Sequence, residues 1–404
     1  MPLQLRPGHH LELLQGAQAF FAALVADMDE ARFEVRLETY IFDFHGSGSQ
    51  VAEALIRAAR RGVVTQLTVD GVGTGRLPAS WRSRFEQAGV RWRVFSRLGP
   101  LGLLNPTRWR RLHRKLGVID GRVAYCGGIN VLDDYYDPNY GTLAAPRFDF
   151  CVRVTGPLVA DVHAVTGQLW WRMQALREAR LRDFGGAWQA MRASSALAAE
   201  ARHGAGPARG PAAAEKAGLL LRDNFRHRVR IERAYRRAIG AARHEVIIAN
   251  AYFLPGGKVR RALIMAARRG VKVQLLLQGR YEYFMQYHAA RPVYGALLGA
   301  GVEIYEYEPS FLHAKVAVID GHWATVGSSN LDPLSLLLAR EANVVVEGPA
   351  FAQPLRERLV RAMAEEGRRI DPADYAHRPL LQRALDRVAF GLMRLALFAI
   401  GMRY

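Results

Sequence analysis

Two stretches of this 404-residue chain decide its fold: His113-Arg-Lys115-Leu-Gly-Val-Ile-Asp120-Gly-Arg-Val-Ala-Tyr-Cys-Gly127-Gly128-Ile-Asn130 and His313-Ala-Lys315-Val-Ala-Val-Ile-Asp320-Gly-His-Trp-Ala-Thr-Val-Gly327-Ser328-Ser-Asn330. His, Lys, Asp, Gly and Asn stand at the same spacings in both stretches. Five residue types in register are far more specific than a lone His-x-Lys, which arises readily by chance. The chain therefore carries one motif twice.

Each motif has the pattern of a strand that enters a tight hairpin. The runs Leu116 to Ile119 and Val316 to Ile319 carry no polar side chain, and both end at Asp-Gly, a dipeptide preferred in two-residue hairpin turns. Residues i and i+2 of a strand face the same side, so each histidine points with the lysine two positions later. A duplicated fold would bring two imidazoles and two ammonium groups to one pocket.

The repeat extends beyond the two motifs. Ala31-Arg-Phe-Glu-Val is matched by Ala242-Arg-His-Glu-Val, and Ala88-Gly-Val by Ala300-Gly-Val. A period of about 200 residues indicates a domain duplication, since solenoid repeats run about 20 to 50 residues. Each copy has the pattern of a helix, an apolar strand, a helix ending in Arg-Arg-Gly and a second strand. This alternation predicts an α/β sandwich in each copy. The apolar strands are expected over Val35 to Phe42 and Val246 to Phe253.

Four segments follow from the repeat and from local composition. Residues 1–193 are expected to form the first domain and residues 218–373 the second. Residues 194–217, rich in Ala, Gly, Arg and Pro without an apolar period, are expected to link them. Residues 374–404 are expected to form a C-terminal amphipathic extension.

The composition narrows the class of protein. Half of the residues are hydrophobic, which excludes a disordered, collagenous or coiled-coil chain. The 56 basic and 37 acidic residues leave a net charge of +19, which points to a polyanionic partner, either nucleic acid or an anionic membrane. Only five of the basic residues are lysines, and Lys115 and Lys315 are two of them. A compact ammonium group is therefore a specific choice at the motifs.

Other site types have little support in the sequence. Cys126 and Cys151 are too few for a disulfide framework or a zinc ribbon, and a reducing compartment is expected. The remaining histidines show no paired ligand spacing, so we expect no metal and no cofactor. The chain has no signal-peptide pattern and no unbroken apolar run of about 18 to 20 residues. A cytosolic or peripheral protein is expected.

Two imidazoles in one pocket suit phosphoryl transfer through a covalent intermediate. One imidazole attacks phosphorus while neutral, and the other protonates the leaving oxygen, so their pKa values must be held apart. Lysine and asparagine side chains can hold the non-bridging oxygens. The nucleophile also needs an acceptor at its other ring nitrogen. Asp149 and Glu341 stand at comparable points after the two motifs and are the candidates; the alternative is that they pair with arginines.

The paired motifs resemble the His-x-Lys-x4-Asp signatures of the phospholipase D superfamily, and the duplicated layout covers nearly the whole chain. Glu38-Thr-Tyr-Ile-Phe, Asn250-Ala-Tyr-Phe, Gly127-Gly-Ile-Asn and Gly327-Ser-Ser-Asn-Leu-Asp-Pro-Leu-Ser are similar to bacterial cardiolipin synthases. The lack of N-terminal membrane spans is similar to the B branch of that family. The resemblance implies two tandem phospholipase D-like α/β sandwich domains related by pseudo-two-fold symmetry.

The resemblance also implies a ping-pong reaction without metal. A phosphatidyl group moves to one histidine and then to the hydroxyl of phosphatidylglycerol, giving cardiolipin and a small alcohol. It implies that His113 is the nucleophile and His313 the acid and then the base, although pseudo-symmetric motifs allow the roles to be exchanged.

The remaining motif residues receive roles from the same resemblance. Asp120 and Asp320 belong to the catalytic motifs but are expected to orient the strand at its turn more than to touch substrate. Gly128 stands where the second motif has Ser328, so the first half offers no hydroxyl there. The phosphate-binding residues are expected to be Asn130, Ser328 and Asn330.

Several alternatives stay open at this stage. A nuclease would also suit the positive charge, hydrolysis to phosphatidic acid differs from transfer only in the acceptor, and a non-catalytic binding protein is the third reading. The intact motifs argue against a non-catalytic binding protein. No nucleic-acid-binding module is recognised, which argues against a nuclease. The expected partners are an anionic phospholipid membrane and phosphatidylglycerol, with peripheral attachment to the cytoplasmic face of the inner membrane; nucleic acid is not expected.

Two segments bear on the membrane. Leu101 to Arg111 combines leucines, a tryptophan and arginines before His113, as in an interfacial contact or an ordinary packed loop. Val388 to Met402 is apolar except for Arg394. It is too short to span a bilayer and suits a helix in the headgroup layer or one docked on the body or on a second subunit.

Overall fold

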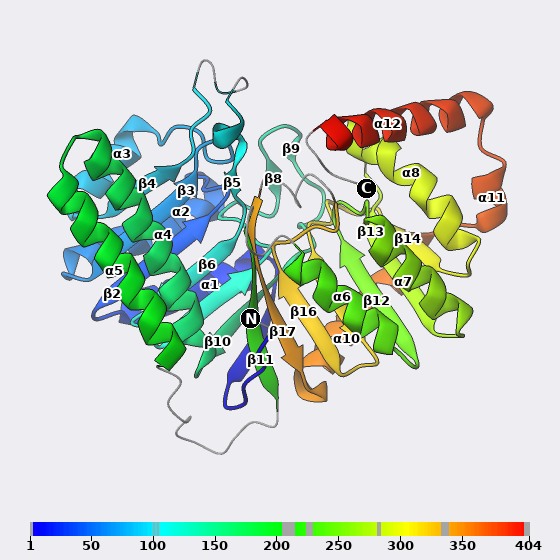
Figure 1. The fold of residues 1–404 in the computed structure, drawn as a ribbon, viewed down its shortest axis with the longest axis horizontal. Helices are drawn as coiled ribbons and strands as arrows, with labels where there is room; N and C mark the ends of the chain where they lie inside the picture. Colours follow the sequence, from blue (N-terminus) through cyan, green and yellow to red (C-terminus); the bar gives the residue numbers. More distant parts are fainter. Residues whose placement is uncertain are drawn as a thin grey trace.

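The computed structural model describes residues 3–99, 102, 105–203, 215–223, 229–280, 284–332 and 339–399. Its first half builds a seven-stranded sheet in the order β1-β10-β7-β6-β2-β3-β4 (Figure 1). Strands β2, β3 and β4 run parallel to one another, and the remaining neighbours are antiparallel. The strands are β1 (His10–Gln15), β2 (Glu34–Thr39), β3 (Val64–Asp70), β4 (Arg91–Phe95), β6 (Lys115–Ile119), β7 (Val123–Gly127) and β10 (Phe150–Thr155).

The second half repeats this order as β11-β17-β16-β15-β12-β13-β14, with β18 added at the edge. Each strand of the first sheet thus has a counterpart in the second, and the predicted duplication into two α/β domains is confirmed. The strands are β11 (Lys216–Arg222), β12 (Glu245–Asn250), β13 (Lys272–Gln278), β14 (Glu303–Tyr307), β15 (Lys315–Ile319), β16 (Trp323–Gly327), β17 (Ala339–Glu347) and β18 (Gly367–Arg369).

The helices also correspond between the halves. In both halves the helix that precedes the second parallel strand ends at an Arg-Arg-Gly sequence. Its glycine, Gly62 or Gly270, has φ 86, and a left-handed glycine is a common helix terminator. The first half contains α1 (Gly16–Glu30), α2 (Gly46–Arg60), α3 (Ala79–Ala88), α4 (Leu158–Arg180) and α5 (Phe184–His203). The second half contains α6 (Arg230–Ala241), α7 (Gly257–Arg268), α8 (Phe284–Leu298), α10 (Pro349–Glu365), α11 (Pro372–Ala376) and α12 (Leu380–Ala399).

The two sheets share one hydrophobic core. Leu116 and Val118 of β6 are buried in the same cluster as Val316 and Val318 of β15. The opposite face of each sheet packs on helices of its own half, in two separate clusters. Because the central cluster draws on both halves, removal of either half would expose apolar surface from the other.

The boundaries between the predicted segments differ in detail from the observed elements. Helix α5 runs to His203 and β11 begins at Lys216, so residues 194–203 of the predicted linker are helical. Residues 204–214 lie outside the described part of the chain. The N-terminal segment of the first half also pairs with the second half, because the backbones of Arg6 and Ala217 of β11 donate to each other at 2.9 Å.

Both motifs form the predicted hairpins. Asp120 and Asp320 have φ 50, and the glycines that follow them have φ 58, so both central turn residues are left-handed, as the Asp-Gly preference requires. Strand β6 pairs with β7, and β15 with β16.

The C-terminal extension docks on the body of the protein. One face of α12 lies against α8, where Ala389 and Met393 are buried. Asp386 is held there by the imidazole Nδ1 of His288 at 2.7 Å and by Arg378 at 2.9 Å. Of the alternatives considered for the C-terminal helix, docking on the body of the protein is therefore the one that applies to this face of α12. No described helix, α12 included, is long and apolar enough to cross a bilayer.

Parts of the segment before His113 lie outside the described residues, namely 100, 101, 103 and 104. The remainder includes a short 3-10 helix, Pro106–Trp109. Trp109 is half-buried and donates its indole N–H to the carbonyl of Gly102 at 3.2 Å. Arg111 points inward to Asp70 at 3.2 Å, so this arginine belongs to the body of the protein.

The shared core predicts that the halves stay together when the chain between them is cut. With a protease site inserted between residues 207 and 208, we expect the cleaved fragments to co-elute in size-exclusion chromatography and to melt in one transition. Separation of the fragments without denaturant would contradict a shared core. The uncut insertion variant is the control.

Candidate active site

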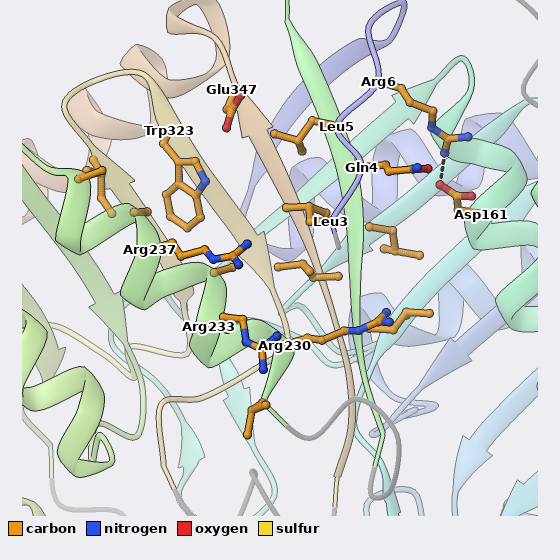
Figure 2. A pocket seen from close by; sticks show the side chains of 18 of the residues that line it. Leu3, Gln4, Leu5, Arg6, Asp161, Arg230, Arg233, Arg237, Trp323 and Glu347 are labelled. Atoms are coloured by element: carbon orange, nitrogen blue, oxygen red, sulfur yellow. Dashed lines mark hydrogen bonds and ion pairs between the residues drawn. The ribbon is translucent and has the colours of Figure 1, made fainter. Parts of the chain in front are cut away.

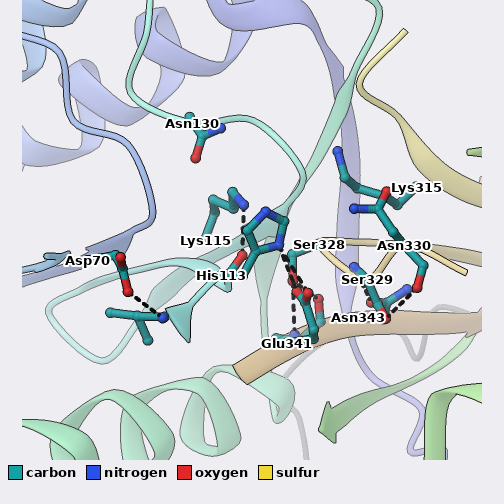
Figure 3. Close-up of polar contacts among 12 residues, drawn as sticks. Asp70, His113, Lys115, Asn130, Lys315, Ser328, Ser329, Asn330, Glu341 and Asn343 are labelled. Carbon is teal, nitrogen blue, oxygen red and sulfur yellow. Dashed lines mark hydrogen bonds and ion pairs between the residues drawn. The ribbon is translucent and has the colours of Figure 1, made fainter. Parts of the chain in front are cut away.

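The two motifs meet at one edge of the paired sheets. Lys115 opens β6 and stands opposite Gly127, the last residue of β7, while Asp149 directly precedes β10. In the second half Lys315 opens β15 and pairs with Asn250 at the end of β12. The histidines stand two residues before these lysines, and Figure 3 shows His113, Lys115, Lys315 and Glu341 around one centre.

His113 is held by a strand of the other half. The segment β5 (Arg111–Leu112) pairs in parallel with the start of β17, and the His113 backbone N–H donates to the carbonyl of Arg340 at 3.1 Å. The next residue along β17 is Glu341, whose carboxylate oxygens lie 3.0 and 3.2 Å from His113 Nδ1.

His313 is held by the first half in the same way. Its backbone N–H donates to the carbonyl of Phe148 at 3.0 Å, and the next residue, Asp149, lies 2.6 Å from His313 Nδ1. Each orienting carboxylate therefore comes from the half that does not carry the histidine. In the described part of the chain the ion-pair partner of each carboxylate is a histidine, not an arginine.

The contact at Nδ1 leaves the other ring nitrogen, Nε2, of each histidine for chemistry. The side chains of His113 and His313 are 15% and 22% exposed, whereas those of Glu341 and Asp149 are 0% and 4% exposed. The imidazoles can thus be reached from solvent, while the carboxylates behind them are enclosed.

The difference between Gly128 and Ser328 has a steric cause. A Cβ atom at Gly128 would lie 2.3 Å from Oδ1 of Asp149, so the short carboxylate occupies that space in the first half. In the second half the Ser328 hydroxyl donates to Glu341 and accepts from the Ala342 backbone N–H at 3.1 Å. Both contacts engage the buried Ser328 hydroxyl, so in this structure it holds Glu341, and the expected phosphate contact of Ser328 finds no support here.

The lysines lie beside the histidines as predicted. The ammonium group of Lys115 donates to the carbonyl of His113 at 2.7 Å, and that of Lys315 donates to the carbonyl of His313. Burial, together with the nearby Lys315, lowers the pKa of Lys115 to about 7. Lys115 is therefore charged below neutral pH and loses its proton as the pH rises through about 7.

The two asparagines take comparable positions beside the lysines (Figure 3). Asn130 Oδ1 accepts the backbone N–H of Ile41 at 3.2 Å, which leaves its amide N–H groups for another acceptor. Asn330 is 2% exposed. Its Oδ1 has no hydrogen-bond partner among the described residues. The amide N–H groups of both side chains can donate to a ligand oxygen, whereas the unpaired Oδ1 of Asn330 can only accept a hydrogen bond, as from a ligand hydroxyl.

The two histidine–carboxylate pairs differ in their protonation. Burial raises the pKa of Asp149 to about 7, against the effect of Lys315. Burial also opposes ionisation of Glu341, but His113, Lys115 and the Ser328 hydroxyl lower the pKa of this carboxylate. Glu341 is therefore an anion at neutral pH, whereas the Asp149–His313 pair can retain a proton.

Both imidazoles have lowered pKa values. Burial lowers the pKa of His113, although Glu341 acts in the opposite direction. Burial, Lys315, Lys115 and His113 together lower the pKa of His313 well below its usual value. In a free site His113 is neutral at neutral pH, as a nucleophile must be.

Asp120 and Asp320 lie away from this site. The carboxylate of Asp120 accepts backbone N–H groups of residues 32–34 at 2.8 to 2.9 Å, and that of Asp320 accepts those of residues 243–245 at 2.8 to 2.9 Å. Five strand residues carry each of them roughly 16 Å from the motif lysine. Their inclusion among the catalytic residues is therefore wrong in position, and their expected role in orienting the strand agrees with the geometry.

A groove of about 1440 Å³ lies beside Asp320, between the N-terminal segment, α4, β11 and α6 (Figure 2). Its walls include Leu3, Leu5 and the α6 arginines Arg230, Arg233 and Arg237. None of the histidines, lysines or asparagines of the motif site lines it.

Tyr40 and Asp70 were missed in the sequence. The ring of Tyr40 lies 5.0 Å from that of His113 and 5.6 Å from Lys115 Nζ. Asp70 is fully buried and accepts the backbone N–H of Leu112 at 2.8 Å, which positions the residue before His113. Tyr40 follows β2 and Asp70 ends β3, two strands that run parallel, and polar residues at the carboxyl ends of parallel strands are a known signal for a site.

Within the described ranges, no group of three or more His, Cys, Asp and Glu residues is arranged to hold a metal ion. The expectation that the reaction uses no metal stays a prediction.

Comparisons with known proteins agree with this geometry. The family model described as "Cardiolipin synthase, PLD-like domain" matches residues 24–145 and 235–363. Cardiolipin synthase B of Salmonella typhi is 36% identical over 398 residues, covering 96% of this chain and 89% of that protein. Cardiolipin synthase B of Escherichia coli K12 is 35% identical over 403 residues, covering 98% and 90%. In fold, phosphatidylserine synthase of Haemophilus influenzae is similar with a TM-score of 0.65 and 11% identity, covering 99% of this chain and 96% of that one.

The crossed pairing predicts which carboxylate controls which imidazole. Because Glu341 is the principal group that raises the pKa of His113, Glu341→Gln should lower the imidazolium pKa of His113 further. Asp149→Asn, the matched control, should change it much less. NMR titration of histidine-labelled protein, assigned with His113→Gln, measures both. Equal shifts in the two variants would contradict the crossed pairing.

Proposed function

The chain belongs to the family of cardiolipin synthases with the phospholipase D-like fold, and we propose that it makes cardiolipin from two phosphatidylglycerol molecules through a phosphatidyl-histidine intermediate. The observation that carries the proposal is the pair of crossed histidine–carboxylate contacts, His113 with Glu341 and His313 with Asp149. It supplies a nucleophile and an acid from two halves with different electrostatic surroundings. The relatives named above support a phospholipid phosphatidyltransferase as the class of enzyme.

In the first step Nε2 of His113 attacks the phosphorus of one phosphatidylglycerol. The bond from phosphorus to the terminal glycerol oxygen breaks, and that oxygen takes a proton from His313, so glycerol leaves. The anionic Glu341 offsets the positive charge that the His113 ring gains on bonding to phosphorus. The Asp149–His313 pair is suited to the acid role, since the pKa of Asp149 near 7 allows the pair to hold a proton.

In the second step a hydroxyl of another phosphatidylglycerol gives its proton to His313 and attacks the phosphorus. The bond between phosphorus and His113 breaks, cardiolipin is formed, and both histidines return to their first state. Lys115, Lys315, Asn130 and Asn330 are proposed to hold the non-bridging oxygens in both steps, because their donors surround the two imidazoles. The exchanged roles, with His313 as the nucleophile, remain the alternative.

Hydrolysis is the second candidate, because water on the phosphohistidine would give phosphatidic acid. Transfer is favoured because the relatives that cover most of the chain are synthases. A nuclease is disfavoured on the same ground, although the net charge of +19 would suit nucleic acid. The same charge suits an anionic bilayer, and we propose peripheral attachment to the cytoplasmic face of the inner membrane.

The proposal predicts a product and a trapped intermediate. Purified protein incubated with phosphatidylglycerol vesicles should form cardiolipin and glycerol, and His113→Ala and His313→Ala should each reduce the rate by at least about 10³-fold. In His313→Gln, phosphate-labelled lipid should remain on His113, as detected by mass spectrometry of acid-labile phosphopeptides.

Asp320→Ala is the matched control for these variants. It removes a motif residue that lies away from the histidines, so the folded fraction should keep its rate within about threefold, while the loss of charge-assisted hydrogen bonds lowers stability by about 1 to 3 kcal/mol. DNA cleavage without a lipid product would sink the proposal. Phosphatidic acid as the main product would select hydrolysis.

The pKa shifts predict the pH profile. The active form needs neutral His113, whose pKa is lowered, and protonated Lys115 and Asp149–His313, with pKa values of Lys115 and Asp149 near 7. Activity should therefore be greatest on the acid side of neutrality and fall as the pH rises through about 7, with a loss of at least about 30-fold in kcat/KM by pH 8.5. Vesicle binding measured at each pH is the control, and a flat profile from pH 6 to pH 9 would exclude these assignments.

A further inference from the structure

Exposed apolar side chains gather at three places on the protein, and all three lie along one edge. They are the corner between α4 and α5, the hairpin of β8 (Tyr136–Asp137) and β9 (Gly141–Thr142), and the outer face of α12. In Figure 1 these elements follow the upper edge of the molecule, and β5 lies between them. We call this edge the apolar rim.

The outer face of α12 is an apolar stripe. Leu381, Leu385, Val388, Leu392 and Leu395 are spaced four, three, four and three residues apart, and all five are exposed, Leu381 to 83%. This spacing places them on one side of a helix. The opposite side of α12 is the one docked on α8, so the stripe has no described part of this chain against it.

The charges of α12 are arranged with the same asymmetry. Its one acidic residue, Asp386, is buried under the helix and bound by His288 and Arg378. Of its three arginines, Arg387 and Arg394 are exposed and Arg383 is half-buried. The outward surface of α12 therefore combines leucines with positive charge alone, the composition of a helix that lies on an anionic bilayer.

The other two places have the same character. At the α4–α5 corner Phe184 is 72% exposed and Trp188 is 67% exposed, with Arg180 and Arg182 exposed beside them. At the β8–β9 hairpin Tyr135 and Tyr136 are exposed. Tryptophan, tyrosine and arginine are the residues enriched where proteins meet lipid headgroups.

We propose that the protein binds an anionic bilayer with the apolar rim, so that the two histidines open toward the headgroups between the three contacts. In this orientation a lipid phosphate reaches His113 while the acyl chains stay in the membrane, and this part of the inference rests on the proposed function. The membrane binding itself does not depend on turnover. His113 follows β5 directly and is bound to Glu341 near the start of β17, so the site lies at the same edge as the contacts.

A bilayer fits the rim better than a second copy of this chain. A second copy would present the same exposed arginines to those of the rim, and like charges across an interface oppose association. Three separate apolar contacts along one edge also suit a flat surface that all of them can reach together. An anionic lipid surface supplies both the apolar layer and the opposite charge.

The chain offers a matched pair of substitutions for the test. Phe184, on the rim, is 72% exposed, and Phe33 is 71% exposed. Phe33 precedes β2 and donates its backbone N–H to Asp120, so it lies at the sheet edge remote from the histidines. Both are exposed phenylalanines whose loss removes no buried contact, so Phe184→Ser and Phe33→Ser differ mainly in location.

Flotation of the full chain with vesicles of phosphatidylcholine and phosphatidylglycerol measures the binding. We expect Phe184→Ser to weaken it at least about threefold, and Leu381→Ser/Leu392→Ser/Leu395→Ser at least about tenfold, because each loses apolar area that enters the headgroup layer. Phe33→Ser should leave binding unchanged within about twofold. Brominated lipid should quench the parent more than Trp188→Phe, and added salt should weaken binding.

Two further readouts keep the result independent of the proposed reaction and of folding. Turnover of a soluble short-chain phosphatidylglycerol should be the same in parent and rim variants, and if no turnover occurs in any of them the binding comparison still stands. Equal effects of Phe184→Ser and Phe33→Ser would overturn the proposal. So would rim variants that turn a dimer into a monomer in sedimentation velocity with vesicle affinity unchanged. Circular dichroism shows whether the triple leucine variant is folded. If it is not, the vesicle binding of Phe184→Ser and the quenching of Trp188 by brominated lipid decide the test.

Discussion

The structure depends above all on the crossed pairing between the two halves. Each histidine segment forms a backbone hydrogen bond to the half that does not carry it, and the next residue of the partner strand supplies the carboxylate for the imidazole. One backbone register therefore sets both the position of the ring and the acceptor at its Nδ1. An error in either register would separate that histidine from its carboxylate, since a shift by one residue turns a strand side chain to the other face. Neither half can build a complete site alone.

Duplication makes the halves alike, but the chemistry needs them to differ. The difference resides in a few atoms around the carboxylates. In the first half Gly128 leaves space for the short side chain of Asp149, and burial leaves that carboxyl near pKa 7. In the second half the Ser328 hydroxyl stabilises the longer Glu341 as an anion. The same fold thus provides two carboxylates with different protonation, which is how a pair of similar groups takes acid and nucleophile roles.

Buried polar groups and exposed apolar side chains lie close together at the edge that carries the two histidines. The buried Lys115 and Lys315, which we propose bind the phosphate, lie beside the histidines, while exposed leucines and aromatic residues stand along the same edge. A lipid substrate presents an anionic headgroup and an apolar chain in that order. The arrangement of the protein matches the arrangement of such a substrate at a membrane surface.

The sequence by itself determined the duplication, the strand-hairpin form of each motif and the identity of the His, Lys and Asn residues, because these depend on short-range spacing and on side-chain chemistry. It also identified Asp149 and Glu341, but their crossed assignment depended on the tertiary structure, since the pairing joins residues 228 and 164 positions apart along the chain. The tertiary structure likewise moved Asp120 and Asp320 to the remote end of their strands and Ser328 behind Glu341. Spacing along a strand tells which residues share a face, but only packing between the halves decides which end of the strand becomes the site. The position of Tyr40 and Asp70 at strand ends was a signal in the sequence, but their contacts with Leu112, His113 and Lys115 depended on segments that the fold brings in from elsewhere.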